Sequence, residues 1–106
     1  MNDIGALNRR LVLEAPVEAG DSAGGVVRTY MAVATLWAQV MPVSARSEIA
    51  GDSLGAVLRH RIVIRARGGI GTRHRLRDGT RVYRIVAMRE SDGRRFLEID
   101  AEERED

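Results

Sequence analysis

The sequence predicts an all-β fold: a small antiparallel β-barrel or sandwich of about six strands with one long inserted loop. Several segments alternate apolar and polar residues with a period of two and are separated by turn residues, which is the pattern of half-buried strands. No segment has a helical period over a length that would give a stable helix. The chain has 106 residues, of which 44% are hydrophobic, so we expect a single domain over residues 1–106 with a small core.

The N-terminal third predicts two strands. Residues 9–16 place Leu11, Leu13 and Ala15 on one face, and Pro16 is expected to end the strand. Residues 18–25 are rich in glycine and small residues and predict a flexible connection. Residues 26–43 read as the second strand, with a bend near residues 32–34.

Residues 57–67 form the clearest strand pattern in the chain. The inward face is expected to hold Leu58, His60, Ile62, Ile64 and Ala66. The outward face carries four guanidinium groups, from Arg59, Arg61, Arg65 and Arg67. A face with this charge is either solvated or in contact with an acidic surface.

The remaining segments predict a hairpin, a last strand and one long loop. The Asp78-Gly79 pair predicts a tight turn between residues 73–77 and 80–88. A second turn at residues 91–93 leads into a last strand at residues 95–101, and residues 102–106 read as a frayed acidic tail. Residues 44–56 have few large apolar side chains and are expected to form a mobile loop or a short helix.

Charge is strongly segregated along the chain. The net charge is −2 over residues 1–58, +9 over residues 59–95 and −5 over residues 96–106. Complementary contacts within the chain, between copies or with a partner would all be consistent with this pattern. The arginines of residues 57–67 and the acids Glu98, Asp100, Glu102 and Glu103 are therefore candidate interface residues.

The sequence contains no motif that supports catalysis or the binding of a cofactor. The chain has no cysteine, and all 17 basic residues are arginine, so the glycines of residues 68–71 lack the lysine of a phosphate-binding loop. His60 reads as a core or rim residue and His74 as a solvated strand residue, not as metal ligands. We therefore expect no enzyme activity, no metal and no cofactor. No apolar run is long enough to span a membrane, and no signal peptide is evident.

Several short motifs, in their order and spacing, resemble those of the head–tail joining proteins of tailed phages, known as the head-closure or stopper family. The motifs are Leu7 to Pro16, Ala34-Thr-Leu-Trp37-Ala-Gln-Val40, Ser44 to Glu48, His60-Arg-Ile-Val-Ile-Arg65, Asp78-Gly-Thr-Arg81-Val-Tyr83 and Phe96-Leu-Glu-Ile. The resemblance runs from about Leu7 to Ala101. The glycine-punctuated loop and the turn at residues 69–72 depart from the family pattern.

The resemblance implies a structural protein in the neck of a virion or phage-like particle, made in the bacterial cytoplasm. In such families a ring of six or twelve copies lies below the portal or adaptor ring, closes the DNA-filled head and gates the channel for double-stranded DNA. It also docks the tail terminator or tail tube. The loop would project toward the channel, which makes Ser44, Arg46, Glu48, Ile49, Asp52 and Leu54 candidate channel residues. Interface candidates are Trp37, Arg59, Arg61, Arg65, Arg67, Glu98 and Asp100.

Two other interpretations stay open. One is another neck or tail component, such as an adaptor or a tail terminator. The other is a small β-barrel that binds nucleic acid through the basic block of residues 59–95, although such barrels need aromatic stacking platforms and few aromatic residues are present. Trp37 is expected to serve as a core or subunit-interface anchor.

Overall fold

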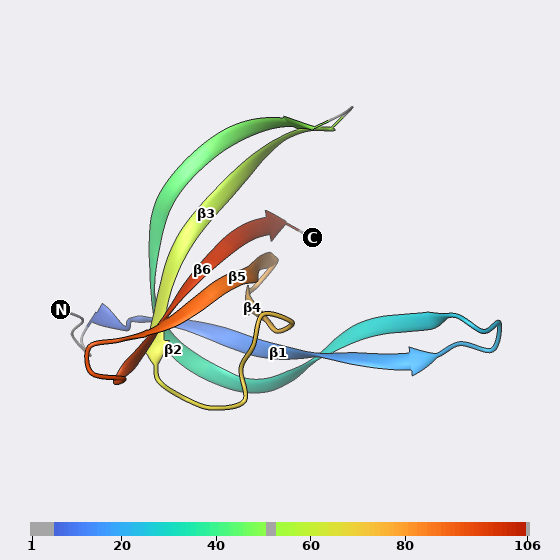
Figure 1. Cartoon of the computed structure of the whole chain (residues 1–106), viewed down its shortest axis with the longest axis horizontal. Helices are drawn as coiled ribbons and strands as arrows, with labels where there is room; N and C mark the ends of the chain where they lie inside the picture. Colours follow the sequence, from blue (N-terminus) through green and yellow to red (C-terminus); the bar gives the residue numbers. More distant parts are fainter. Residues whose placement is uncertain (1–5, 51–52, 106) are drawn as a thin grey trace.

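The computed structural model describes residues 6–50 and 53–105, and for residues 44–50, 53–57 and 104–105 it describes the backbone only. Six antiparallel strands close a barrel in the order β1-β2-β3-β6-β5-β4. Their bounds are β1 Arg9–Gly20, β2 Val26–Ala50, β3 Ser53–Arg65, β4 Arg75–Asp78, β5 Arg81–Ser91 and β6 Phe96–Glu105. The predicted antiparallel barrel is confirmed (Figure 1).

The barrel core forms from the inward faces that the period-two alternation predicted. Large aliphatic side chains and Tyr83 fill it, with Leu11, Leu13, Ile62, Ile64, Leu76 and Ile99 buried completely or almost so. A small second cluster lies on the outer face, where Leu7 covers Val63 and Phe96. This cluster explains why Val63, on the otherwise charged face of β3, is also buried.

Two long hairpin arms leave the barrel, and both contain part of the 25-residue strand β2 (Figure 1). Beyond Glu14, β1 has no partner except β2, because β4 pairs with β1 only at residues 12–14. Likewise, β6 reaches β3 only as far as Leu58, so residues 46–50 and 53–57 pair only with each other. We call these hairpins the β1–β2 arm and the β2–β3 arm.

The predicted strand over residues 57–67 is too long at its end, since β3 stops at Arg65 and Ala66 is exposed. Three other predicted boundaries were wrong because the strand continues further than expected. Pro16 does not end β1, which continues to Gly20. The connection to β2 is the short turn of residues 21–25, where Asp21 accepts hydrogen bonds from the backbone N–H groups of Ala23 and Gly25. Residues 102–105 belong to β6 and are not a frayed tail. Residues 44–50 and 53–56 form strands instead of a loop or a short helix.

The three extensions share one physical reason. Small and polar residues have weak strand propensity by themselves, but a ladder that has already formed in the barrel supplies hydrogen-bond partners for the next residues. The predicted bend near residues 32–34 is confirmed, since the register of β1 and β2 shifts there and leaves Val33 unpaired as a bulge. The Asp78-Gly79 turn is also confirmed, because Asp78 pairs with Arg81 across a two-residue loop and Gly79 has φ +63°.

Candidate functional site

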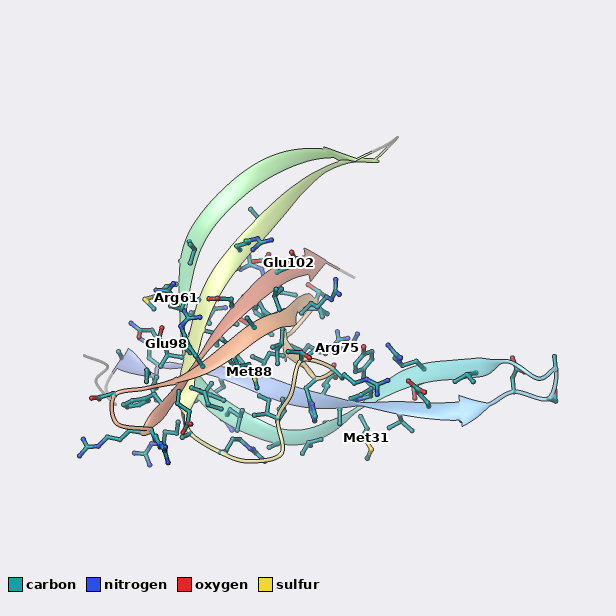
Figure 2. All side chains as sticks on the ribbon, viewed as in Figure 1. Met31, Arg61, Arg75, Met88, Glu98 and Glu102 are labelled. Carbon is teal, nitrogen blue, oxygen red and sulfur yellow. The ribbon has the colours of Figure 1, made fainter. Side chains whose placement is uncertain are left out.

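The charged outer face of β3 lies directly beside the acidic residues of β6. In the register of the two strands, Arg59 is opposite Glu102 and Arg61 is opposite Asp100. Arg59 Nη2 lies 3.3 Å from Glu102 Oε1. Arg61 Nε lies 3.8 Å from both Glu98 Oε1 and Asp100 Oδ1. The predicted basic and acidic faces are therefore one surface, and their charges pair within the chain (Figure 2).

Arg89 of β5 completes this ion-pair network from the other side of β6. Its Nη1 donates to Asp100 Oδ2 at 2.9 Å, and its Nη2 donates to Glu98 Oε1 at 3.4 Å. The hydrogen bond from Arg89 is the main cause that lowers the pKa of Asp100, and Arg61 and Arg59 add to it. The hydrogen bond between Arg89 and Asp100 also raises the pKa of Arg89. The sequence left open whether the basic and acidic residues contact each other within the chain, between copies or with a partner. For Glu98 and Asp100, the structure shows contacts within the chain.

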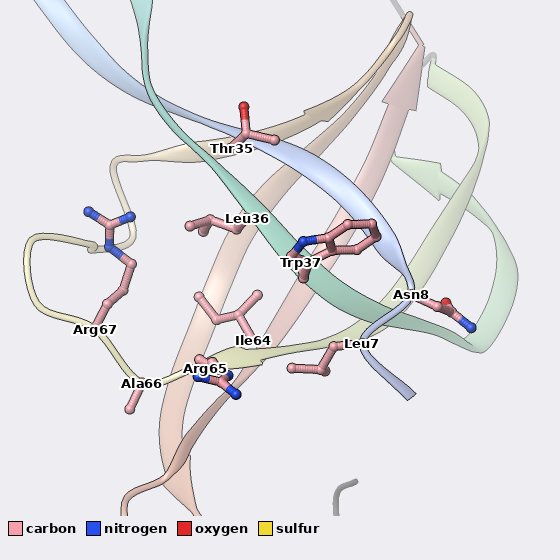
Figure 3. Close-up of a pocket in the computed structure, with 9 residues that line it drawn as sticks. All are labelled: Leu7, Asn8, Thr35, Leu36, Trp37, Ile64, Arg65, Ala66 and Arg67. Carbon is pink, nitrogen blue, oxygen red and sulfur yellow. The ribbon is translucent and has the colours of Figure 1, made fainter. Parts of the chain in front are cut away.

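Arg65 and Arg67 lie apart from that network, beside Trp37. They line an open groove of about 840 Å³, whose apolar walls include Leu36 and Ile64. The groove exists because β2 and β3 separate at this end of the barrel: their pairing starts only at Ala38 and Ile64. Figure 3 shows Leu36 and Ile64 facing the space between Trp37 and Arg67.

Trp37 is not a core residue of this chain. Its side chain points outward from β2 and is 56% exposed, and the guanidinium of Arg10 lies 5.5 Å from the centre of its ring. An exposed tryptophan at the edge of an apolar groove is typical of protein–protein contacts. Of the two anchor roles expected for Trp37, that of a subunit-interface anchor is consistent with this position.

The barrel end nearest the β2–β3 arm is polar. His60 points inward, as predicted, and its ring packs edge-on against Tyr83 with 5.3 Å between centroids. His60 Nε2 lies 2.7 Å from Glu103 Oε1, although the two groups are not aligned as a hydrogen bond. Arg9 pairs with Asp78, and this contact is the main cause that raises the pKa of Arg9. Charged side chains thus close this end, where the apolar core stops.

A basic groove on the outer side of β2, β4 and β5 was not predicted as a site. It has a volume of about 530 Å³ and is lined by Arg28, Tyr30, Thr72, Arg73, His74, Arg75, Val82 and Arg84. The guanidinium of Arg75 stacks on Tyr30 at 3.8 Å, while Arg28 and Arg73 share the carboxylate of Glu18. The +9 charge of residues 59–95 was the available signal, but only the barrel brings Arg28 from β2 to the same place.

The predicted channel residues that the structure describes lie on the β2–β3 arm or, in the case of Ser44, at its base. The backbone of Ser44, Arg46, Glu48 and Ile49 belongs to β2, and Ile49 pairs with Leu54 of β3 near the end of the ladder. Asp52 lies outside the described residues. These residues therefore belong to a paired hairpin that projects from the barrel (Figure 1).

Within residues 6–50 and 53–105, no group of three or more His, Asp or Glu side chains is placed to hold a metal ion. His74 Nδ1 accepts a hydrogen bond from the backbone N–H of Gly71 at 3.2 Å, which gives this histidine a local structural role. No helix in the described part of the chain has the length and hydropathy to cross a membrane.

The fold and these surfaces define a small all-β protein whose projecting arms and grooves are suited to contacts with other proteins. The sequence matches the family of phage head completion proteins over residues 3–104. The chain therefore belongs to the phage head completion protein family. The predicted family relationship is confirmed, and this family consists of structural virion proteins, not enzymes.

Solved structures that are similar over nearly the whole chain include the following two. A chain of the virion of a native gene transfer agent particle is 32% identical with a TM-score of 0.79, covering 90% of this chain and 92% of that one. The solution structure of protein SF1141 from Shigella flexneri 2a is 27% identical with a TM-score of 0.71, covering 96% of both chains. No curated protein matches the sequence. The family match and the similarity to the gene transfer agent virion together make the chain a structural component of a phage or phage-like virion.

Proposed function

We propose that copies of this chain form a ring of six or twelve subunits below the portal or adaptor ring. The ring closes the DNA-filled head and provides the platform for the tail terminator or tail tube. The observation that carries this proposal is the barrel with two long arms, neither of which pairs with a third strand in the described residues, in a member of the head completion family. An arm that projects this far from a small barrel has a use only where a neighbouring molecule or a channel receives it.

The two arms would have different roles in such a ring. We assign the β2–β3 arm, with Ser44, Arg46, Glu48, Ile49 and Leu54, to the central channel, where it narrows the path of the DNA. Support comes from the strand pairing, which extends from the barrel to the pair Ala50 and Ser53 and makes a semi-rigid projection. Trp37, Arg65 and Arg67 are assigned to contacts between subunits or with the adjoining ring.

Electron microscopy tests the ring. The full chain is co-expressed with the product of the adjacent upstream reading frame, which is expected to encode the adaptor. The expected result is a ring of this chain docked on an adaptor ring. A chain that stays monomeric beside an assembled adaptor contradicts the proposal.

The gating role has its own test. Residues 47–56 are replaced by Asn-Gly, which supplies a tight hairpin turn and leaves the pair Arg46 and Val57 to end the arm. Particles with this shortened arm are expected to assemble with normal rings but to retain less DNA, measured as nuclease-protected DNA per particle. Normal retention of DNA would remove the gating role and leave the connector role intact.

The basic groove favours a second candidate function, contact with the phosphate backbone of DNA. Four arginines converge there, and the two carboxylates that pair with them, Glu14 and Glu18, neutralise only part of that charge. Binding by the isolated chain should then weaken steeply with salt. Arg84→Glu is expected to reduce this affinity, whereas Arg94→Glu, in the exposed turn before β6, serves as the charge-matched control.

A further inference from the structure

The β1–β2 arm has one face without charge. Alternation along β1 continues the inward face of Leu11 and Leu13 into the arm, and the register with β2 adds the residues opposite. This arm face consists of Ala15, Val17, Ala19, Val27, Thr29 and Met31. On the arm it has no core to cover it: Met31 is 57% exposed, Val27 50% and Val17 37%.

The opposite face of the same arm is charged and is contacted by the rest of the chain. Glu18 pairs with Arg28 across the arm at 2.7 Å and with Arg73 of the loop before β4 at 2.9 Å. Arg75 stacks on Tyr30 on this side. Figure 2 shows Met31 projecting from the arm on the side away from Arg75. The chain thus supports one face of the arm and leaves the apolar one open.

The groove beside Trp37 offers a surface of the complementary kind. Its apolar part is formed by Leu7, Leu36, Ile64 and Ala66 with Trp37 at the edge, and its charged lining residues are Arg65 and Arg67 (Figure 3). Its lining contains no acidic side chain. A molecule that fills it therefore needs an apolar face flanked by negative charge.

The arm has that combination. Between residues 15 and 31, Glu18 and Arg28 pair with each other on the opposite face, so the net charge of −1 comes from Asp21, which lies in the tip turn at the end of the apolar face. The groove of the same copy cannot receive the arm, because Thr35 and Leu36 of the groove belong to β2 itself, four residues beyond Met31. A paired hairpin does not fold back over so short a distance, so the groove must belong to a second copy.

We propose that the arm face of one copy lies in the groove beside Trp37 of the next copy. The contact joins two different surfaces of each subunit, and it is therefore head-to-tail and generates a ring when the rotation closes. This inference deepens the proposed ring function and rests on it. It also gives a role to the exposed Trp37 and to Arg65 and Arg67, which have no place in the ion-pair network of β3, β5 and β6.

Paired variants of the full chain test this contact. Met31→Asp puts a charge on the arm face, Trp37→Glu puts a charge at the groove, and Val86→Asp changes an exposed valine of β5 outside both surfaces. Oligomeric state is measured by sedimentation velocity and native mass spectrometry, with circular dichroism to verify folding. Met31→Asp and Trp37→Glu are each expected to weaken self-association about 100-fold or more, because a carboxylate is desolvated where a large side chain was buried. Val86→Asp should associate like the wild type.

Mixing the two interface variants gives the decisive result. The arm of the Trp37→Glu chain and the groove of the Met31→Asp chain are both intact, so the mixture should form a one-to-one dimer that cannot extend. If Trp37→Glu alone still assembles while Met31→Asp does not, the arms contact each other and the groove assignment is wrong. If Met31→Asp does not fold, Val27→Asp near the arm tip is used in its place.

The same variants separate this inference from the ring itself. In the co-expressed neck complex, a ring that forms normally with both Met31→Asp and Trp37→Glu overturns the arm-to-groove contact and leaves the proposed function in place. A wild-type chain that forms no ring in that complex overturns both. A ring formed by wild type and Val86→Asp, but by neither interface variant, supports both.

Discussion

Removal of the Leu76 side chain tests how the barrel is closed. Leu76 lies on β4, the four-residue strand that joins β1 to β5 and completes the ring of strands. Only three residue pairs connect β4 to β1, so this seam has few hydrogen bonds. The side chain of Leu76 is fully buried in the core between the two neighbouring strands. Packing of this one leucine should therefore account for much of the stability of the seam.

Leu76→Ala is expected to lower the free energy of unfolding by about 3 kcal/mol. A buried leucine cut to alanine costs about 2–5 kcal/mol, depending on how far the surroundings collapse into the cavity. Complete burial argues for the upper part of this range, and any collapse of the adjoining loop of residues 66–74 into the cavity would move the cost toward the lower part. For a chain of this size, 3 kcal/mol corresponds to a fall in Tm of roughly 12–24 °C.

Urea unfolding followed by far-ultraviolet circular dichroism measures this change. Val86→Ala serves as the control, because Val86 is 43% exposed at the bulge of β5 and its truncation should cost less than about 0.5 kcal/mol. A loss below about 1 kcal/mol for Leu76→Ala, or one equal to that of the control, would refute the conclusion that β4 closes the barrel through core packing.

Three further changes have defined outcomes. Glu14→Gln should cost about 1–2 kcal/mol in urea unfolding, because the side chain of Glu14, 13% exposed, accepts hydrogen bonds from Arg75 and Arg77, and the substitution removes the carboxylate that both guanidinium groups contact; no change would mean that water replaces these contacts. Gly79→Ala should cost about 1 kcal/mol more than Gly68→Ala, since both sites have open space but only Gly79 has positive φ; equal melting temperatures would contradict this. Asp100→Asn should destabilise the protein by about 0.5–1 kcal/mol at pH 7. Its pKa is lowered in the fold, so this stabilisation exists above pH about 4 and is lost as pH falls through the folded pKa; a deficit that does not shrink as the pH is lowered from 7 would refute the ion pair.

The ion-pair network changes how the charge pattern of this protein should be understood. Basic and acidic segments that are far apart in the sequence suggest two surfaces for assembly. Pairing of β3 with β6 brings Arg61 within 3.8 Å of Glu98 and Asp100, and Arg89 approaches the same acids from β5. Exposed pairs of this kind contribute little stability each. Charge that is left for contacts with other molecules is found instead at the groove beside Trp37 and in the basic groove.

The sequence by itself determined the class of fold and the inward faces of the strands. Alternation of residue type is a local property, so Leu11, Leu13, Ile62 and Ile64 could be assigned to the core without knowledge of their neighbours. The Asp78-Gly79 turn is local for the same reason, since its conformation depends on the positive φ that glycine adopts at no steric cost. The resemblance of short motifs in a fixed order indicated the family.

Only the tertiary structure decided where the strands end and which charges meet. Residues 102–105 become a strand because β3 and β5 present partners to them, and residues 44–50 because β3 continues beside them; no feature of their own composition requires it. The pairing of Arg59 with Glu102 joins residues 43 positions apart, and the sequence does not specify a register over that distance. Exposure of Trp37 has the same origin: β2 and β3 separate beside it, and the groove exists only where two paired strands part.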